Sequence, residues 1–153
     1  MKKSFKLINI NRRDIHILFK WRNEINTRRN SISSKKIKFI QHEHWFTKRL
    51  KQKPLFFWKL KFNNNIIGFI RLDKKNRAFY LNYLIDKGFR NRGYGSNIIG
   101  QMLKKSVLKK RKLKILAVSK KQNFKSIRAI LANNFYIISK KNNIVKFKYE
   151  NRK

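Results

Sequence analysis

The spacing of apolar and polar positions divides the chain into strands and helices. Alternation of the two predicts strands over 5–10, 55–62, 66–72 and 78–85, and the Asn-rich stretch 63–65 predicts a hairpin turn. Shorter apolar runs predict further strands over 113–118, 136–139 and 144–149, the last two paired around Asn142 and Asn143.

Two helices are predicted before the first hairpin. The first is expected to follow Asp14, whose side chain would cap it, and to turn four apolar side chains inward: Ile15, Leu18, Phe19 and Trp21. The second covers 39–50, with Trp45 and Phe46 as its main core contacts. The stretch 26–34 between them is polar and predicts a loop.

Two more helices are predicted in the second half. One begins after Gly95 and carries an apolar stripe: Ile98, Ile99, Met102, Leu103 and Val107. The other covers 125–133 and turns inward Ile127, Ile130 and Leu131. A late strand–helix–strand crossover requires a parallel pair of strands. We therefore expect a single α/β domain over residues 1–153, with a central sheet of mixed parallel and antiparallel strands (an α+β mixed sheet) flanked by about four helices.

Composition limits the chemistry that the chain can perform. The 153 residues include 42 Lys and Arg, 6 Asp and Glu, 3 His and no Cys, for a formal net charge of +36. Without Cys, a disulfide, a thiolate metal site and a cysteine nucleophile are excluded. The three His residues form no metal-ligand pattern, so no metal is expected. The 13 Phe residues favour a packed globule over disorder.

The positive charge has two interpretations. A protein that binds nucleic acid through its phosphates would carry such an excess. The alternative is a coding bias toward Lys, Asn, Ile and Phe, and it is favoured because Lys is spread along the whole chain. Either origin gives a field that attracts anionic ligands. The chain has neither a signal-peptide core nor an apolar run that could span a membrane, so we expect a cytoplasmic protein with no membrane or nucleic-acid partner.

The strongest functional signal lies in residues 84–96. An apolar strand ends there, a basic loop with Gly93 and Gly95 follows, and an amphipathic helix begins. This order directs backbone N–H groups and the positive end of a helix dipole at one point, which suits a pyrophosphate. The loop lacks the third Gly of a dinucleotide-binding motif and the Gly-Lys-Ser/Thr of a P-loop. A plain strand-to-helix turn stays an alternative.

The spacing Arg-x-x-Gly-x-Gly, which begins at Arg90, resembles the acetyl-coenzyme A loop of the GNAT acetyltransferase superfamily. Asn123, Ser126 and Phe135 match a second GNAT segment, although Asn134 replaces its Gly. The resemblance implies acetyl-CoA as co-substrate, bound by Leu84, Ile85, Arg90, Asn91, Arg92, Gly93, Tyr94, Gly95, Ser96, Asn123 and Ser126. An ordinary helix cap is the alternative role for Asn123.

The N-terminal half resembles a narrower branch of the family. Trp21-Arg22-Asn23, followed by His42 and Trp45-Phe46, is similar to the N-acetyltransferases of the pseudaminic-acid pathway, which act on nucleotide-linked amino sugars. The resemblance implies acceptor-binding roles for Trp21, Arg22, Asn23, Arg28, His42 and Arg71. The alternatives are core packing for the aromatic residues and His42, and solvated charges for the arginines. Ribosomal-protein N-terminal acetyltransferases begin with a similar Trp-Arg segment.

The resemblance implies direct transfer of acetyl to an amine, with an anionic nucleotide-linked amino sugar as the expected acceptor. The Tyr that many family members use as an acid is replaced by Ile130, so Tyr83 is the candidate proton donor. Glu24 and Glu43 are the only Glu residues expected near the acceptor. Two other functions stay open, a ribosomal-protein-type N-terminal acetyltransferase and a non-catalytic basic module that binds nucleic acid.

Overall fold

A seven-stranded sheet organises the fold. The structure is a computed structural model that describes residues 4–109 and 111–150, without the side chains of residues 106 and 107. The strands, in the spatial order β1-β2-β3-β4-β5-β7-β6, are β1 (Phe5–Asn9), β2 (Phe57–Phe62), β3 (Asn65–Lys75), β4 (Ala78–Ile85), β5 (Ile115–Lys120), β7 (Ile144–Tyr149) and β6 (Phe135–Lys141). Only β4 and β5 pair in parallel in the described chain, which confirms the predicted mixed sheet.

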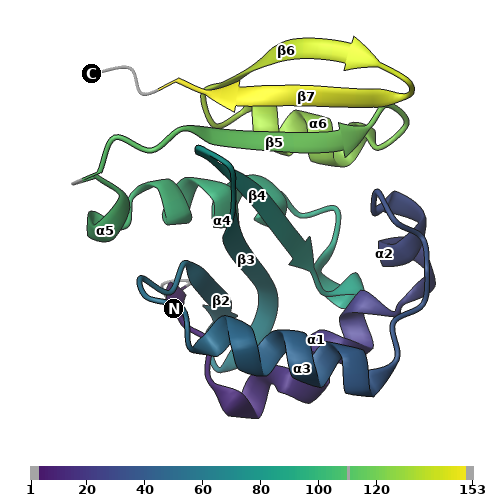
Figure 1. Ribbon diagram of the computed structural model, residues 1–153, viewed down its shortest axis with the longest axis vertical. Coiled ribbons are helices and arrows are strands. Elements are labelled where there is room, and N and C mark those ends of the chain that lie inside the picture. The colour runs from purple at the N-terminus through teal and green to yellow at the C-terminus, as the bar shows by residue number, and fades with distance from the viewer. Residues whose placement is uncertain (1–3, 110, 151–153) are drawn as a thin grey trace.

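The described residues form six α-helices and two short 3₁₀ helices. The α-helices are α1 (Ile15–Arg22), α2 (Ile25–Asn30), α3 (Phe39–Leu50), α4 (Tyr94–Leu103), α5 (Ser106–Lys109) and α6 (Phe124–Leu131). The 3₁₀ helices are η1 (Arg12–Asp14) and η2 (Lys87–Phe89). Figure 1 shows α1 and α3 together, and α2 apart from them on the side toward which β4 and β5 diverge.

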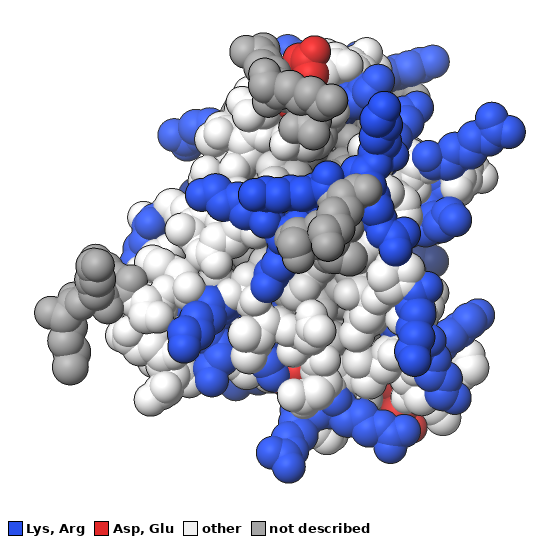
Figure 2. Space-filling model, turned by 90° about the vertical axis from the view of Figure 1, so that its left-hand side faces the viewer, with Lys and Arg blue, Asp and Glu red and all other residues white. Residues whose placement is uncertain are grey.

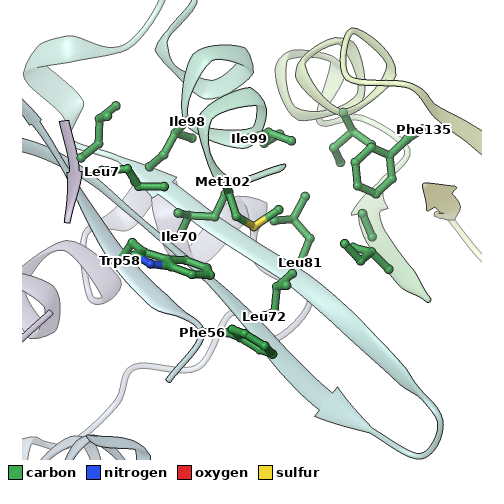
Figure 3. Close-up of a cluster of buried hydrophobic side chains, with 14 of the residues drawn as sticks. Leu7, Phe56, Trp58, Ile70, Leu72, Leu81, Ile98, Ile99, Met102 and Phe135 are labelled. Carbon is green, nitrogen blue, oxygen red and sulfur yellow. The ribbon is translucent and has the colours of Figure 1, made fainter. Parts of the chain in front are cut away.

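Two clusters of buried side chains hold the helices on the sheet. In the larger one, Ile98, Ile99 and Met102 of α4 are fully buried, and Figure 3 shows Met102 next to Ile70 and Leu81 of the sheet. The smaller cluster packs α1 and α3 against the sheet through Leu18, Trp21, Phe46, Phe57 and Phe69. The apolar stripes predicted for α1, α3 and α4 therefore account for most of the helix packing.

Several predicted helix boundaries and contacts are wrong. The predicted loop 26–34 contains α2, because Glu24 accepts hydrogen bonds from the first backbone N–H groups of that helix. The helix after Gly95 ends at Leu103 instead of continuing to Val107, whose side chain lies outside the described part. On α6, Leu131 is 42% exposed and does not face inward.

Asp14 has a different role from the one predicted. Its side chain makes no capping hydrogen bond to α1. It accepts from the backbone N–H of Asn11 at 2.8 Å and from Lys59 Nζ at 2.8 and 2.9 Å, and both charged side chains are buried. This ion pair connects the start of α1 to β2, and sequence spacing could not reveal a partner so far along the chain.

Candidate active site

A cleft opens where β4 and β5 separate. The two strands are paired only at Phe79–Ile115 and Tyr80–Leu116, and beyond these residues they diverge. The cleft measures about 1160 Å³ and is lined by the end of β4, by Val118 and Ser119 of β5, by the first turn of α4 and by one face of α6. Its other wall consists of residues from α1 and α2. The site therefore joins the loop predicted to bind acetyl-CoA with the region predicted to bind the acceptor.

The start of α4 presents free backbone N–H groups to the cleft. Gly93, which precedes the helix, has a φ of 79°, a left-handed conformation that glycine adopts without strain. The first intrahelical donor is Asn97, whose N–H reaches Gly93 O at 3.1 Å. The N–H groups of Tyr94, Gly95 and Ser96 precede it, so the helix itself gives them no acceptor. All three residues line the cleft, where this helix N-terminus suits a pyrophosphate.

Tyr83, Asn123 and Ser126 meet across the cleft floor. Tyr83 Oη donates to Ser126 Oγ at 3.1 Å, and Asn123 Oδ1 accepts from the backbone N–H of Ser126 at 3.3 Å. Burial raises the pKa of the Tyr83 phenol, and the hydrogen bond with Ser126 only partly opposes this. The phenol therefore keeps its proton at neutral pH and can act as a donor. The Asn123 side chain caps α6, the alternative role considered for it.

Arg90 joins the donor loop to α2. Its Nε donates to Ile85 O at 3.0 Å, and its Nη2 donates to Glu24 Oε2 at 2.9 Å and Thr27 Oγ1 at 3.0 Å. Burial alone would raise the pKa of Glu24, but hydrogen bonds from Arg90, Thr27 and backbone N–H groups lower it to about 2. Glu24 is therefore ionised at neutral pH and is a poor general base.

A hydrogen bond from β5 holds the other end of α2. Lys120 Nζ, at the end of β5, donates to Arg29 O at 2.7 Å. The helix is thus connected to both strands that border the cleft, and Asn26, Thr27 and Asn30 line its wall. Sequence reasoning missed these polar wall residues because α2 has no apolar stripe. The one local signal for a capped helix was the carboxylate of Glu24 two and three residues before the N–H groups of Asn26 and Thr27.

Two arginines stand close together at the acceptor end of the cleft. Arg71 packs its guanidinium 5.0 Å from the Trp45 ring centroid, and its Nε donates to both carboxylate oxygens of Asp73 at 3.0 and 2.9 Å. The half-buried side chain of Arg22 lines the cleft and makes no hydrogen bond or ion pair with any described side chain. Burial and, to a smaller extent, the charge of Arg71 lower the pKa of Arg22, and the nearby Asp73 carboxylate opposes this only in part. The Arg22 guanidinium therefore keeps its hydrogen-bond donors available for an anionic ligand.

Five predicted site residues lie outside the set of described residues that line the cleft: Trp21, Asn23, Arg28, His42 and Arg92. Trp21 packs on Phe69, and Asn23 makes two 2.8 Å hydrogen bonds with the Ile37 backbone. His42 Nε2 donates to a backbone carbonyl at 3.0 Å, and burial lowers its pKa. Their predicted binding roles stay predictions, and we leave these five out of the site proposed below.

The described lining of the cleft contains no acidic residue and no His. Its charged side chains are all basic: Arg22, Arg71, Lys87, Arg90, Lys125 and Arg128. Glu43, the second Glu expected near the acceptor, is exposed on α3 and does not line the cleft. The cleft therefore favours anionic ligands and offers no carboxylate to bind a polycation or to accept a proton.

The fold, the diverging strands and the free N–H groups at the start of α4 define a GNAT-type acetyltransferase. The chain belongs to the acetyltransferase (GNAT) family, whose family model matches residues 15–135. No curated protein sequence matches the chain significantly. No helix in the described part of the chain is long and apolar enough to cross a membrane.

Solved structures share the fold at low sequence identity. A domain from Methanocaldococcus jannaschii matches with a TM-score of 0.80 at 19% identity, covering 96% of this chain and 98% of that one. Spermidine N-acetyltransferase from Vibrio cholerae, in complex with CoA and spermine, matches with a TM-score of 0.81 at 16% identity, covering 94% of both chains. The Campylobacter jejuni N-acetyltransferase PseH matches with a TM-score of 0.69 at 17% identity, covering 97% and 99%. Acetyl-CoA as co-substrate agrees with the family and with the CoA-bound neighbour.

Proposed function

We propose that residues 1–153 form one cytoplasmic N-acetyltransferase domain that transfers acetyl from acetyl-CoA to an amine carrying negative charge, with a nucleotide-linked amino sugar as the acceptor class. The observation that carries the acceptor proposal is the pair of arginines, Arg22 and Arg71, in a cleft lined by no described acidic residue. The structural neighbours include an enzyme for spermidine and the Campylobacter PseH, so the fold alone does not select an acceptor.

The donor half fits CoA through main-chain groups. The N–H groups of Tyr94, Gly95 and Ser96 would hold the pyrophosphate, with Asn91 and Gly93 shaping the loop before them. The C-terminal end of β4, at Leu84 and Ile85, would lie along the pantetheine arm of CoA, and Asn123 and Ser126 would border that arm at the start of α6. Arg90 would act indirectly, because its hydrogen bonds already go to Ile85, Glu24 and Thr27.

The acceptor half would recognise charge. An acceptor phosphate beside Arg22 would give that guanidinium its first hydrogen-bonding partner and would offset its repulsion by Arg71. A polyamine or aminoglycoside would bring more positive charge into a cleft without a described carboxylate. The same charge distribution disfavours them relative to a phosphate-bearing amine.

The chemical step needs one proton removed and one supplied. The amine nitrogen forms a C–N bond with the acetyl carbon and loses one proton to water, the thioester C–S bond breaks, and the thiolate takes up a proton. Acetyl-CoA supplies the acetyl group as an activated thioester. Tyr83 would supply the proton, because its buried phenol is protonated and lies within the cleft beside Ser126.

Donor and acceptor are tested separately. Saturating acetyl-CoA should raise the melting temperature, and the absence of any shift would refute the donor assignment. Thiol release should then be measured with a UDP-linked amino sugar, a peptide with a free N-terminal alanine, and spermidine. Fastest turnover is expected for the sugar nucleotide. A preference for the peptide would instead indicate an N-terminal protein acetyltransferase.

A matched pair of variants on α1 tests the role of Arg22. Arg22→Gln should raise the KM for the sugar nucleotide about 10- to 100-fold, the equivalent of a lost charged hydrogen bond, and leave acetyl-CoA binding unchanged. Lys20→Gln removes the same charge from an exposed position of the same helix and should change neither value. Equal effects of the two variants would show that only the overall charge matters.

A further inference from the structure

Two strongly basic segments meet at the end of β4 opposite the donor loop. One is residues 74–77, the end of β3 and the turn before β4, and the other is residues 109 and 111–114, from the last residue of α5 to the start of β5. The N–H of Phe79 donates to Lys114 O at 2.8 Å, and Phe79 pairs with Ile115. The fold therefore brings together two basic runs that are far apart in the sequence. We call them together the basic end.

The basic end carries a high density of exposed cations. Seven of its described basic residues are exposed: Lys74, Lys75, Arg77, Lys109, Arg111, Lys112 and Lys114. Neither segment contains an acidic residue. The adjacent Asp73 carboxylate already pairs with Arg49 and Arg71. Figure 2 views the molecule from the side on which α5 lies in Figure 1, and Lys and Arg side chains cross the middle of this face while acidic atoms are visible only in small areas.

The clustering of exposed Lys and Arg at the basic end changes the interpretation of the positive net charge. An even spread of Lys along the sequence favours compositional bias, but the fold gathers these cations on one face, away from the cleft lining. Like charges held this close repel one another and oppose folding. A bound polyanion relieves that repulsion and releases its own counterions.

We propose that the basic end binds single-stranded RNA through its phosphate backbone, as an activity separate from acetyl transfer. The shape of the surface selects this partner. Its described residues form a strand end, a turn and an irregular segment, and the one helix that they touch is α5 with four residues. It therefore offers no recognition helix for the major groove of duplex DNA and no amphipathic helix for a lipid surface. A flexible strand can follow such a surface and place successive phosphates beside the lysines.

Two variants with equal net charge test the proposal. The first replaces Lys74, Lys75, Arg77, Lys112 and Lys114 by Gln at the basic end. The control replaces five other exposed lysines by Gln: Lys35, Lys36, Lys121, Lys140 and Lys141. Binding of a fluorescent 20-nucleotide oligouridylate is measured by anisotropy over a range of salt concentrations. An acetyl-CoA thermal shift on each variant shows that the fold and the cleft are intact.

The expected result is a selective loss at the basic end. Each lost phosphate contact lowers the slope of log affinity against log salt by about 0.7 for a single strand. If three of the five side chains contact phosphates, the slope falls by about 2. If the variant and the unchanged protein bind RNA equally at 1 M salt, the variant then binds about 100-fold more weakly than the unchanged protein at 0.1 M salt. The control variant should keep most of its affinity.

Three outcomes overturn the proposal. Equal losses in the two variants would mean that RNA responds only to overall charge. Unmeasurable binding by the unchanged protein at 0.1 M salt would mean that no RNA surface exists. Tighter binding of the basic end to phosphatidylcholine vesicles containing phosphatidylglycerol than to RNA would assign the surface to a membrane. None of these results bears on the acetyl-CoA thermal shift, which tests the donor assignment alone.

Discussion

Replacing Glu24 by Gln tests how firmly α2 is held against the donor loop. The carboxylate accepts from Arg90 Nη2 at 2.9 Å, from Thr27 Oγ1 at 2.9 Å and from the N–H groups of Asn26 and Thr27 at 3.1 and 3.0 Å. An amide of the same shape keeps part of the helix cap but loses the charge. The substitution therefore isolates the ion pair with Arg90, whose side chain is 26% exposed.

The size of the effect follows from the pKa of Glu24. That pKa falls from 4.5 to about 2 on folding, which at about 1.4 kcal/mol per pKa unit sets an upper limit of about 3.5 kcal/mol. Solvent screening at this partly exposed site reduces the contribution to about 1–2 kcal/mol. For a domain of this size, such a loss lowers the melting temperature by about 3–6 °C.

The pH dependence of stability distinguishes the Glu24 ion pair from other effects of the substitution. Because folding lowers the pKa of Glu24, the stabilisation is fully present above the unfolded value of 4.5 and is lost as the pH falls toward 2. Urea unfolding at pH 7 should show Glu24→Gln less stable than the unchanged protein, and the gap should close as the pH approaches 2. Glu43→Gln removes an exposed carboxylate and should change stability little at any pH. A gap that stays constant with pH, or an equal loss in the Glu43 variant, would refute the reasoning.

Three further substitutions have distinct expected effects. Gly68→Ala should lower the free energy of unfolding in urea by about 1–3 kcal/mol, because a Cβ there would lie 2.9 Å from a backbone oxygen of β4. At Gly88 the nearest atom to a Cβ is 3.6 Å away, so Gly88→Ala should leave the free energy of unfolding nearly unchanged. Lys59→Met should lower the free energy of unfolding by about 3–5 kcal/mol, because it leaves the buried Asp14 carboxylate without its cation. Adding Asp14→Asn should recover part of that stability in a double-mutant cycle, and strictly additive effects of the two substitutions would contradict the ion pair. Tyr83→Phe should lower kcat about 100-fold or more with acetyl-CoA affinity unchanged, and an unchanged kcat would exclude Tyr83 as the proton donor.

Much of the fold can be read from local patterns. Alternation and short apolar runs identified the strands, and the stripe that begins at Ile98, Ile99 and Met102 identified the buried face of α4, because these patterns depend on side chains close in sequence. The glycine loop was predictable for the same reason, since Gly93 needs only local backbone freedom to adopt its positive φ. The diverging strands follow from the short parallel pairing, which no local pattern encodes.

The parts that could not be predicted depend on distant partners. α2 has no apolar stripe, and Arg90, which binds its cap residue, comes from the donor loop far along the chain. The same contact explains why the direction of the Arg90 side chain was not foreseeable from the loop motif. His42 illustrates the converse case, since a polar residue on a predicted helix became buried once Ile15 O supplied an acceptor.

The missing general base has an electrostatic consequence for the proposed reaction. An ammonium ion that enters the cleft meets Arg22, Arg71 and the other lining cations, with no carboxylate among the described lining residues. Neighbouring positive charge favours the neutral form of an amine and lowers its pKa, so the acceptor can shed its proton to water before attack. An acceptor phosphate beside Arg22 would retain the molecule in the cleft while its amine is being deprotonated. The cationic lining would thus perform both tasks, binding the anionic part of the acceptor and supplying the reactive form of its amine.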